Sequence, residues 1–302
     1  MSFCSDVKSE LCAVIPEREC CVKALLNSAI AFFNTVGSDK IKMNTENAFV
    51  VRYINMLINS YLHINAQTTT RKSDKTRGYS LYIEDKDEIY KVGRELGLIN
   101  ETTGQISGVL SGDLCVNECC QRAVVKGAFL ISGSVTDPKK SYHFEISNHR
   151  KKTINDLNEI LISMDFPSKV IKRGSEYILY IKEKEAIADI LNLMGNKEMF
   201  FKYHDIILMK EVKNQLNRKQ NFEYANLDKT VNAAVEQKIA IENLIKNKKF
   251  DTLPPALKEI ALLRINNPED SLSELAKKCS EPITRSGINH RLKKIVEMGL
   301  KG

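Results

Sequence analysis

The residues with the clearest capacity for chemistry lie near the C-terminus, in the segment TRSGINHRLKKIVEMG that begins at Thr284. Its apolar residues recur at helical spacing, which leaves a basic and polar side opposite them. Arginine can pair with O6 and N7 of guanine, asparagine with N6 and N7 of adenine, and lysine with phosphate. We therefore treat this side as a candidate DNA-contacting face, formed by Thr284, Arg285, Ser286, Asn289, His290, Arg291, Lys293 and Lys294.

The two preceding segments have the pattern of helices that could hold this face. Pro254 and Pro255 suit a helix start, where a missing N–H is harmless, and Ser271 can cap a short second helix. The inward side of the short helix is formed by Leu272, Leu275, Ala276 and Cys279. Pro282 then keeps the chain from continuing as a helix. The three segments predict an all-α helix-turn-helix whose last helix enters the major groove, against the alternative of an ordinary helical hairpin with a solvated basic face.

The charge of the chain is concentrated in its last third. Of the formal net charge of +7, residues 206–302 account for +6, with 18 basic against 12 acidic residues. A basic excess in this part indicates a polyanionic partner for it. The 302 residues exceed the length of a typical single domain, and no apolar run reaches the length of a signal-peptide core or a membrane span. We expect two or three domains in a cytoplasmic protein without a membrane partner.

The chain contains eight cysteines, and their spacing is not that of a common zinc motif. They are Cys4, Cys12, Cys20, Cys21, Cys115, Cys119, Cys120 and Cys279. Two pairs are adjacent in sequence, and no CxxC pair is answered by a second one. We interpret them as reduced thiols, mostly small buried hydrophobic side chains, with a zinc site as the alternative. We accordingly expect no metal and no cofactor.

Two matches at nearly one offset indicate an internal duplication in the first two thirds of the chain. CCVKALLNSAIAFF from Cys20 aligns with CCQRAVVKGAFLIS from Cys119, and LYIEDKDEI from Leu81 aligns with LYIKEKEAI from Leu179. Each copy, about 20–97 and 119–195, has the pattern of a helix rich in small residues, short strands, a helix, a hairpin and a closing helix. Because small residues let two backbones approach closely, we expect the opening helices to pack against each other about a pseudo-two-fold axis.

This order of elements resembles the LAGLIDADG homing-endonuclease fold, so the expected class is α+β with a duplicated LAGLIDADG-like αββαββα-type domain. In that family the eighth position of each motif helix is an acidic residue that holds catalytic metal. In this sequence Phe33 and Ser132 occupy those positions. A phenyl ring offers no ligand and a hydroxyl a weak one, whereas Mg²⁺ prefers carboxylate oxygen. We expect no enzymatic activity; the alternative is a metal-dependent DNA endonuclease that uses displaced acids such as Asp39 and Asp137.

Residues 206–249 are polar, have a helical pattern, and contain NRKQNFEYANLDKT (217–230). Together with PPALKEIALLRI, SGINHRLKKI and CCQRAVVKGAFLISGSVTDPKKSYHFEI, this segment resembles the WhiA family of Gram-positive bacterial proteins. Small amides cap and bridge backbone well, which favours contacts between domains, and contact with DNA phosphate is the alternative. The residues concerned are Asn217, Arg218, Asn221, Asn226 and Lys229.

The resemblance implies a degenerate LAGLIDADG-like domain followed by a helix-turn-helix similar to region 4 of sigma factors. The expected layout is 1–205 for the first domain, 206–249 for a helical linker, and 250–302 for the second domain. The family implies a nucleoid-associated transcription regulator of cell division and chromosome segregation, and of sporulation in spore-forming relatives. Its implied partners are double-stranded DNA and RNA polymerase or another transcription regulator. A non-specific architectural protein that binds DNA or RNA is a further alternative, recognised by steep salt dependence without sequence preference.

Overall fold

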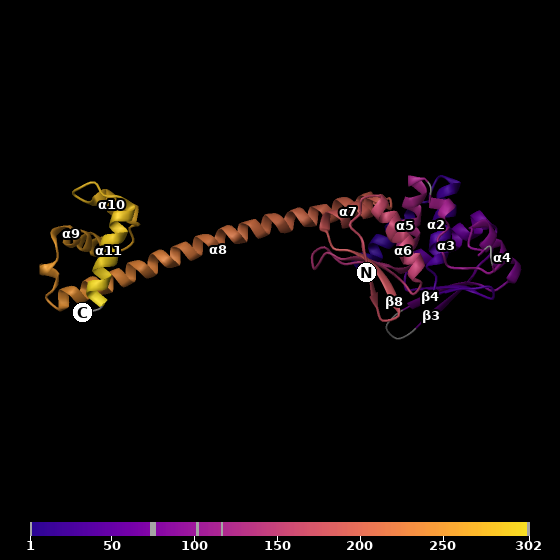
Figure 1. Cartoon of the computed structure of the whole chain (residues 1–302), viewed down its shortest axis with the longest axis horizontal. Helices are drawn as coiled ribbons and strands as arrows, with labels where there is room; N and C mark the ends of the chain where they lie inside the picture. The colour runs from indigo at the N-terminus through magenta and orange to yellow at the C-terminus, as the bar shows by residue number, and fades with distance from the viewer. Residues whose placement is uncertain (1, 73–76, 101–102, 116, 301–302) are drawn as a thin grey trace. The chain divides into compact units, whose positions relative to one another are not determined.

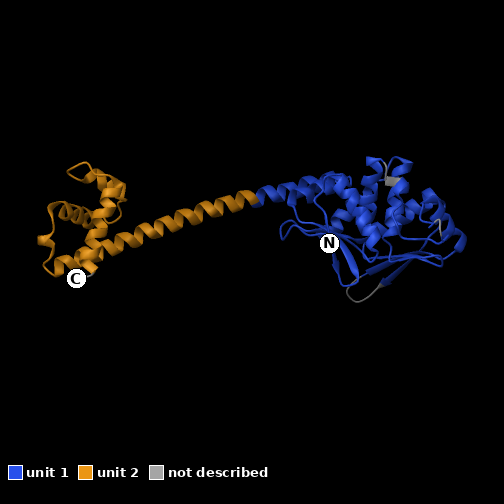
Figure 2. Cartoon of the chain, in the orientation of Figure 1, with its two compact units in different colours: residues 1–210 blue, residues 211–302 orange. Residues whose placement is uncertain are grey.

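The computed structural model describes residues 2–72, 77–100, 103–115 and 117–300. The chain divides into two compact units, residues 1–210 and 211–302 (Figure 2). Each unit has its own core of buried apolar side chains. Within the ranges given above, no helix combines the length and the apolar character that a membrane crossing requires.

The first unit contains the same succession of elements twice. The first copy consists of α2 (Glu19–Ala31), β1 (Thr35–Val36), β2 (Ile41–Thr45), α3 (Ala48–Leu57) with a π-helical continuation (Ile58–Leu62), β3 (Gln67–Lys72), β4 (Arg77–Ile83) and α4 (Lys86–Glu95). The second consists of a 3₁₀ turn (Gly112–Cys115), α5 (Glu118–Ser132), β5 (Gly133–Val135), β6 (Phe144–Asn148), α6 (Lys151–Ser163), β7 (Lys169–Arg173), β8 (Glu176–Ile181) and α7 (Lys184–Leu193). Each copy forms an antiparallel sheet, in the orders β1-β2-β4-β3 and β5-β6-β8-β7. The predicted α+β class and the duplication are confirmed.

The two sheets turn one face toward the helices, as the side-chain alternation along their strands requires (Figure 1). In β2, Ile41 and Met43 are buried whereas Asn44 is exposed. In β6, Phe144 and Ile146 are buried in the same alternating way. Helix α3 packs on the first sheet, and α5 and α6 pack on the second. The core therefore lies between helices and sheets, as in other layered α+β folds.

A helix at the N-terminus, α1 (Phe3–Ala13), was not among the elements expected from the sequence. Ser2 caps it by accepting a hydrogen bond from the backbone N–H of Ser5 at 3.2 Å. Val7 and Leu11 are fully buried in the core of the first unit. The capping serine and this i, i+4 apolar pair are the signals of the helix in the sequence.

Helices α2 and α5 pack against each other with their backbones in close contact. Ser28 Oγ donates a hydrogen bond to the carbonyl of Val124 at 2.7 Å, from one helix to the other. A Cβ added to Gly127 would lie 2.5 Å from the carbonyl oxygen of Leu25, which no real side chain tolerates without movement. The backbones therefore meet where the sequence predicted a contact of small residues.

The second unit is helical and begins inside α8 (Lys197–Lys246). The later elements are a 3₁₀ turn (Phe250–Thr252), α9 (Pro255–Asn266), α10 (Leu272–Lys278) and α11 (Arg285–Leu300). Ile241 and Leu244 of α8 belong to the same buried cluster as the apolar residues of α9, α10 and α11. Gly299 of α11 lies so close to α8 that an added Cβ would be 2.3 Å from the carbonyl oxygen of Ala240. The C-terminal part of α8 is therefore integral to the core of this unit.

This packing bears on where the C-terminal domain starts, because the sequence led us to expect a linker up to residue 249. A fragment that began at residue 250 would lack Ile241 and Leu244, which are 0% and 2% exposed in the intact chain. Removing two fully buried aliphatic side chains costs several kcal/mol, about 2–5 for each by analogy with truncation to alanine. Residues 211–302 keep all the members of the core cluster.

Replacing Gly127 by Ala should destabilise the first unit, because the added methyl group meets backbone rather than a movable side chain. We expect a loss of about 1–3 kcal/mol or more, the usual cost of overpacking. Chemical denaturation followed by far-ultraviolet circular dichroism measures it. Gly112→Ala is the matched control, because a Cβ at Gly112 has no neighbour within 4 Å. Equal stability of the two variants would show that α2 and α5 do not touch in solution.

Candidate nucleic-acid interface

Helix α11 presents the predicted polar face to solvent. Its opposite side is held by Ile288, Leu292 and Ile295, all fully buried. The helix starts at a capping residue, since Thr284 Oγ1 accepts a hydrogen bond from the N–H of Gly287 at 3.1 Å. The exposed residues are Thr284, Arg285, Ser286, Asn289, His290, Lys293 and Lys294, while Arg291 is half-buried. All eight sequence-predicted residues thus belong to the start or to the outer sides of this helix.

Helix α10 is short, so its geometry depends on its N-terminal cap. Ser271 Oγ accepts a hydrogen bond from the N–H of Glu274, and the Glu274 carboxylate accepts one from the N–H of Ser271, at 3.3 and 2.7 Å. This is a complete capping box, which satisfies two backbone donors reciprocally. The hydrogen bonds from Ser271 keep the pKa of the Glu274 carboxyl below its usual range, so Glu274 accepts as a carboxylate at neutral pH.

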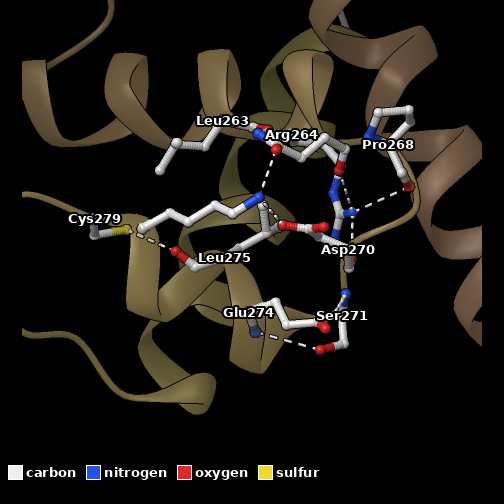
Figure 3. A network of polar contacts seen from close by, with 10 residues as sticks. Leu263, Arg264, Pro268, Asp270, Ser271, Glu274, Leu275 and Cys279 are labelled. Carbon is white, nitrogen blue, oxygen red and sulfur yellow. Dashed lines mark hydrogen bonds and ion pairs between the residues drawn. The ribbon is translucent and has the colours of Figure 1, made fainter.

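A buried arginine fixes the turn between α9 and α10 (Figure 3). Arg264 is 2% exposed, and its Nη1 lies 2.8 Å from the carbonyl oxygen of Asp270 and 3.3 Å from that of Pro268. Lys278, near the end of α10, lies 2.7 Å from the Asp270 carboxylate and donates to the side chain of Asn267 at 2.6 Å. Burial lowers the pKa of Arg264, yet guanidinium remains charged at any physiological pH. The buried Arg264 guanidinium therefore holds the backbone carbonyls of this turn in place.

Arg264 was not among the residues predicted to be functional, although the sequence carries a signal for it. Leu257, Ile260, Ala261 and Arg264 stand at i, i+3, i+4 and i+7 of α9, and the structure buries all four. An arginine at the fourth position of such an apolar stripe indicates a buried guanidinium that must find backbone partners.

A further contact joins α9 to the turn that precedes α11. Glu259 Oε1 accepts a hydrogen bond from the N–H of Ser280 at 2.6 Å. This hydrogen bond lowers the pKa of the Glu259 carboxyl, and the charge of Arg291 acts in the same direction. Arg291 is also half-buried, which distinguishes it from the exposed members of the α11 face.

An open groove of about 590 Å³ within the second unit brings α8 together with the start of α11. Asn226 and Lys229 of α8 line it together with Arg285 and Asn289 of α11. Ser271 and Ser273 of α10 add hydroxyl groups to the same groove. Two of the five polar residues singled out in 217–230 therefore share a cavity with Arg285 and Asn289 of the predicted DNA-contacting face.

The other three polar residues of that segment, Asn217, Arg218 and Asn221, are exposed on α8 and lie outside the groove residues. All five belong to the second unit. The structure therefore joins Asn226 and Lys229, but not the other three, to the α11 surface.

In the first unit, the two positions that the sequence aligned with the metal-binding acids of homing endonucleases carry no carboxylate. Phe33 is 1% exposed and lies beyond the end of α2. Ser132 is the last residue of α5, and its hydroxyl donates to the carbonyl of Ala128 at 3.5 Å. Asp137, considered above as a displaced acid, accepts a hydrogen bond from the N–H of Lys139 and so stabilises a turn. Among the described side chains, the one group of three or more close ligands consists of cysteines.

Comparison with known proteins agrees with this architecture. Residues 216–299 match the family model of the WhiA C-terminal HTH domain, and residues 40–103 and 121–213 match that of the WhiA LAGLIDADG-like domain. The probable cell division protein WhiA of Thermoanaerobacter pseudethanolicus is 37% identical over 311 residues, covering 100% of this chain and 98% of the relative. That of Clostridium botulinum is 34% identical over 304 residues, covering 98% and 96%.

The chain belongs to the WhiA family. The crystal structure of full-length WhiA from Thermatoga maritima is similar in fold, with a TM-score of 0.59, 24% identity, and coverage of 100% of this chain and 99% of that one. The crystal structure of a WhiA N-terminal LAGLIDADG domain matches with a TM-score of 0.51 and 19% identity, covering 64% of this chain and 92% of that one. The predicted combination of a LAGLIDADG-like domain with a helix-turn-helix is thereby confirmed.

Replacing Arg264 by Met should destabilise the second unit, because carbonyls that now accept from a guanidinium would lose their donor while remaining part-buried. A buried acceptor left without a partner costs about 1–3 kcal/mol. Arg285→Met is the control, since it removes an exposed arginine of the same unit and should change the free energy of unfolding by no more than about 0.5 kcal/mol. Thermal unfolding of both full-length variants measures the difference. A loss of stability in Arg285→Met as large as that in Arg264→Met would contradict the assigned role of Arg264.

Proposed function

We propose that this WhiA-family protein is a sequence-specific DNA-binding transcription regulator. The observation that supports this most directly is the face of α11, which carries exposed arginine, asparagine, serine and lysine on a helix fixed by an organised turn. Such a helix at the end of a helix-turn-helix is placed to enter the major groove. We propose residues 211–302 as the DNA-binding domain, because its core requires the end of α8.

Within this domain the residues divide by chemistry. Arg285 and Asn289 stand in the first half of α11, where a recognition helix contacts bases, and both have the bidentate geometry for guanine or adenine. Lys293 and Lys294 stand further along and supply charge to phosphate. Thr284, Ser286, His290 and Arg291 complete the proposed surface. Lys229 and Asn226 share the groove with Arg285 and Asn289, so we extend the phosphate-contacting set to α8.

The biological setting is proposed from the relatives, whose names describe a probable cell division protein. We propose that the protein acts in the cytoplasm on the chromosome and regulates genes of cell division, with chromosome segregation and sporulation as the wider processes to examine. RNA polymerase, or another transcription regulator bound near it, is the proposed protein partner.

Nuclease activity is not part of the proposal. The fold of the first unit supports such chemistry in proteins that keep the motif acids, but Phe33 and Ser132 provide no carboxylate. We assign this unit a structural role and propose that the protein is not an enzyme.

Substitution of base-contacting and phosphate-contacting residues should have different effects on affinity. Arg285→Ala should weaken binding to the preferred site by about 1–3 kcal/mol and affect random DNA much less. Lys293→Ala and Lys229→Ala should weaken binding to both and each reduce the salt slope by about one unit, because a phosphate contact releases a counterion regardless of sequence. The preferred site would first be found by chromosomal binding maps of the intact protein, and titrations at several salt concentrations then separate the two effects.

Lys219→Ala is the matched control, since Lys219 is exposed on α8 outside the groove. It should leave the affinity for both DNAs and the salt slope unchanged, because Lys219 makes no proposed phosphate contact. Equal losses on both DNAs for Arg285→Ala would indicate a non-specific architectural protein, and an unchanged salt slope for Lys229→Ala would remove α8 from the interface.

The purified protein should not cleave DNA in Mg²⁺ or Mn²⁺, because neither motif position offers a carboxylate to hold a catalytic cation. Supercoiled plasmid together with the mapped binding fragments would serve as substrates, and conversion to nicked or linear forms would be quantified. Reproducible cleavage that is abolished both by EDTA and by Asp137→Ala would establish the endonuclease alternative instead.

A further inference from the structure

The four cysteines of the two duplicated CC pairs converge on one point of the first unit. Cys20 and Cys21 stand in the first turn of α2, and Cys119 and Cys120 stand in the first turn of α5. All four sulfur atoms lie within 4.8 Å of one another. The separation is 3.9 Å both between Cys20 Sγ and Cys21 Sγ and between Cys119 Sγ and Cys120 Sγ. The internal duplication thus produces a cluster of four thiols with two from each copy.

We propose that Cys20, Cys21, Cys119 and Cys120 bind one Zn²⁺ ion as a structural site that joins the two repeats. Four thiolates are a complete and common ligand set for structural zinc. With Zn–S bonds of about 2.3 Å, the sulfurs of a regular tetrahedron are about 3.8 Å apart. The two sulfur separations of 3.9 Å match this edge, so the adjacent pairs need little movement to become ligands.

The surroundings of the cluster favour a negatively charged metal–thiolate centre. The sulfurs lie at the N-termini of α2 and α5, where unpaired N–H groups and the helix dipoles stabilise thiolate. Arg18, the residue preceding α2, directs its Nη1 at Cys119 Sγ across 3.9 Å. Zinc with four thiolates carries excess negative charge, so a nearby guanidinium is the expected outer partner.

The spacing criteria applied to the sequence could not reveal this site. Each pair is adjacent rather than separated by two residues, and the pairs lie 99 positions apart. Only the close approach of α2 and α5 brings them together. A disulfide between two of the four sulfurs is the competing chemistry, and it becomes one outcome of the test.

The experiment uses the full-length protein, purified in a thiol-free reductant and loaded with Zn²⁺ before desalting. Zinc is quantified by mass spectrometry, and Co²⁺ replaces it for optical spectra. We expect about one zinc per chain and, with cobalt, the charge-transfer and d–d bands of tetrahedral thiolate coordination. Removal of zinc by a chelator should lower the melting temperature.

The double variant Cys20→Ser/Cys119→Ser should retain less than about a tenth of the zinc, because two of the four ligands are lost. Cys4→Ser/Cys279→Ser is the matched control, since it also removes two cysteines but leaves the cluster intact and should keep full zinc. If the first double variant fails to fold, Cys20→Ser alone serves, because Cys20 is exposed. Its cobalt spectrum should then lose thiolate charge-transfer intensity relative to the control.

Several results would overturn the proposal. The first is that the wild-type protein binds less than about a tenth of an equivalent of zinc after loading. The second is that Cys20→Ser/Cys119→Ser binds as much zinc as the control variant. The third is that the cobalt spectrum of Cys20→Ser is identical to that of the wild-type protein. Intact-mass and peptide analysis that found a disulfide within the cluster in the presence of reductant, with no bound metal, would assign these cysteines to redox chemistry instead.

Discussion

The first unit depends on one contact, the backbone-to-backbone approach of α2 and α5. A serine hydroxyl of one helix reaches a carbonyl of the other, and Gly127 faces the Leu25 carbonyl at a distance that excludes any Cβ. Around this pair each copy arranges its own four-stranded sheet in the same order. Because the two copies share one core cluster, neither can bury its apolar helix surfaces without the other. The contact between α2 and α5 thus joins the two copies into a single folded unit.

In the second unit, hydrogen bonds from charged side chains to backbone groups hold the short helices in position. A helix of seven residues such as α10 has little stability of its own. The capping box at its start, the Arg264 guanidinium behind its entry turn, and the Glu259 carboxylate at its exit hold it between α9 and α11. The apolar core alone would leave the carbonyls of these turns unsatisfied. The polar contacts therefore determine how α11 presents its exposed face.

The sequence predicted those features that are local or periodic. Helix starts at Pro255, Ser271 and Thr284 follow from capping rules, and the exposed side of α11 follows from its apolar spacing. The duplication could be seen because two matches have nearly the same offset. Features that arise from packing between distant segments could not be predicted in this way. They include the groove between α8 and α11, the contribution of Ile241 to the C-terminal core, and the meeting of Cys20 with Cys119.

The central helix pair has two chemically different ends. At the C-terminal ends, where homing endonucleases place metal-binding acids, this chain has the buried Phe33 and a serine bonded to its own helix. At the N-terminal ends it has four thiols in mutual contact distance. Soft thiolate binds zinc in a closed site without an open coordination position, whereas carboxylates around Mg²⁺ leave positions for water and phosphate. A metal bound at the thiol end would therefore stabilise the helix pair and would not provide a hydrolytic centre, which is consistent with a first unit that acts as a scaffold.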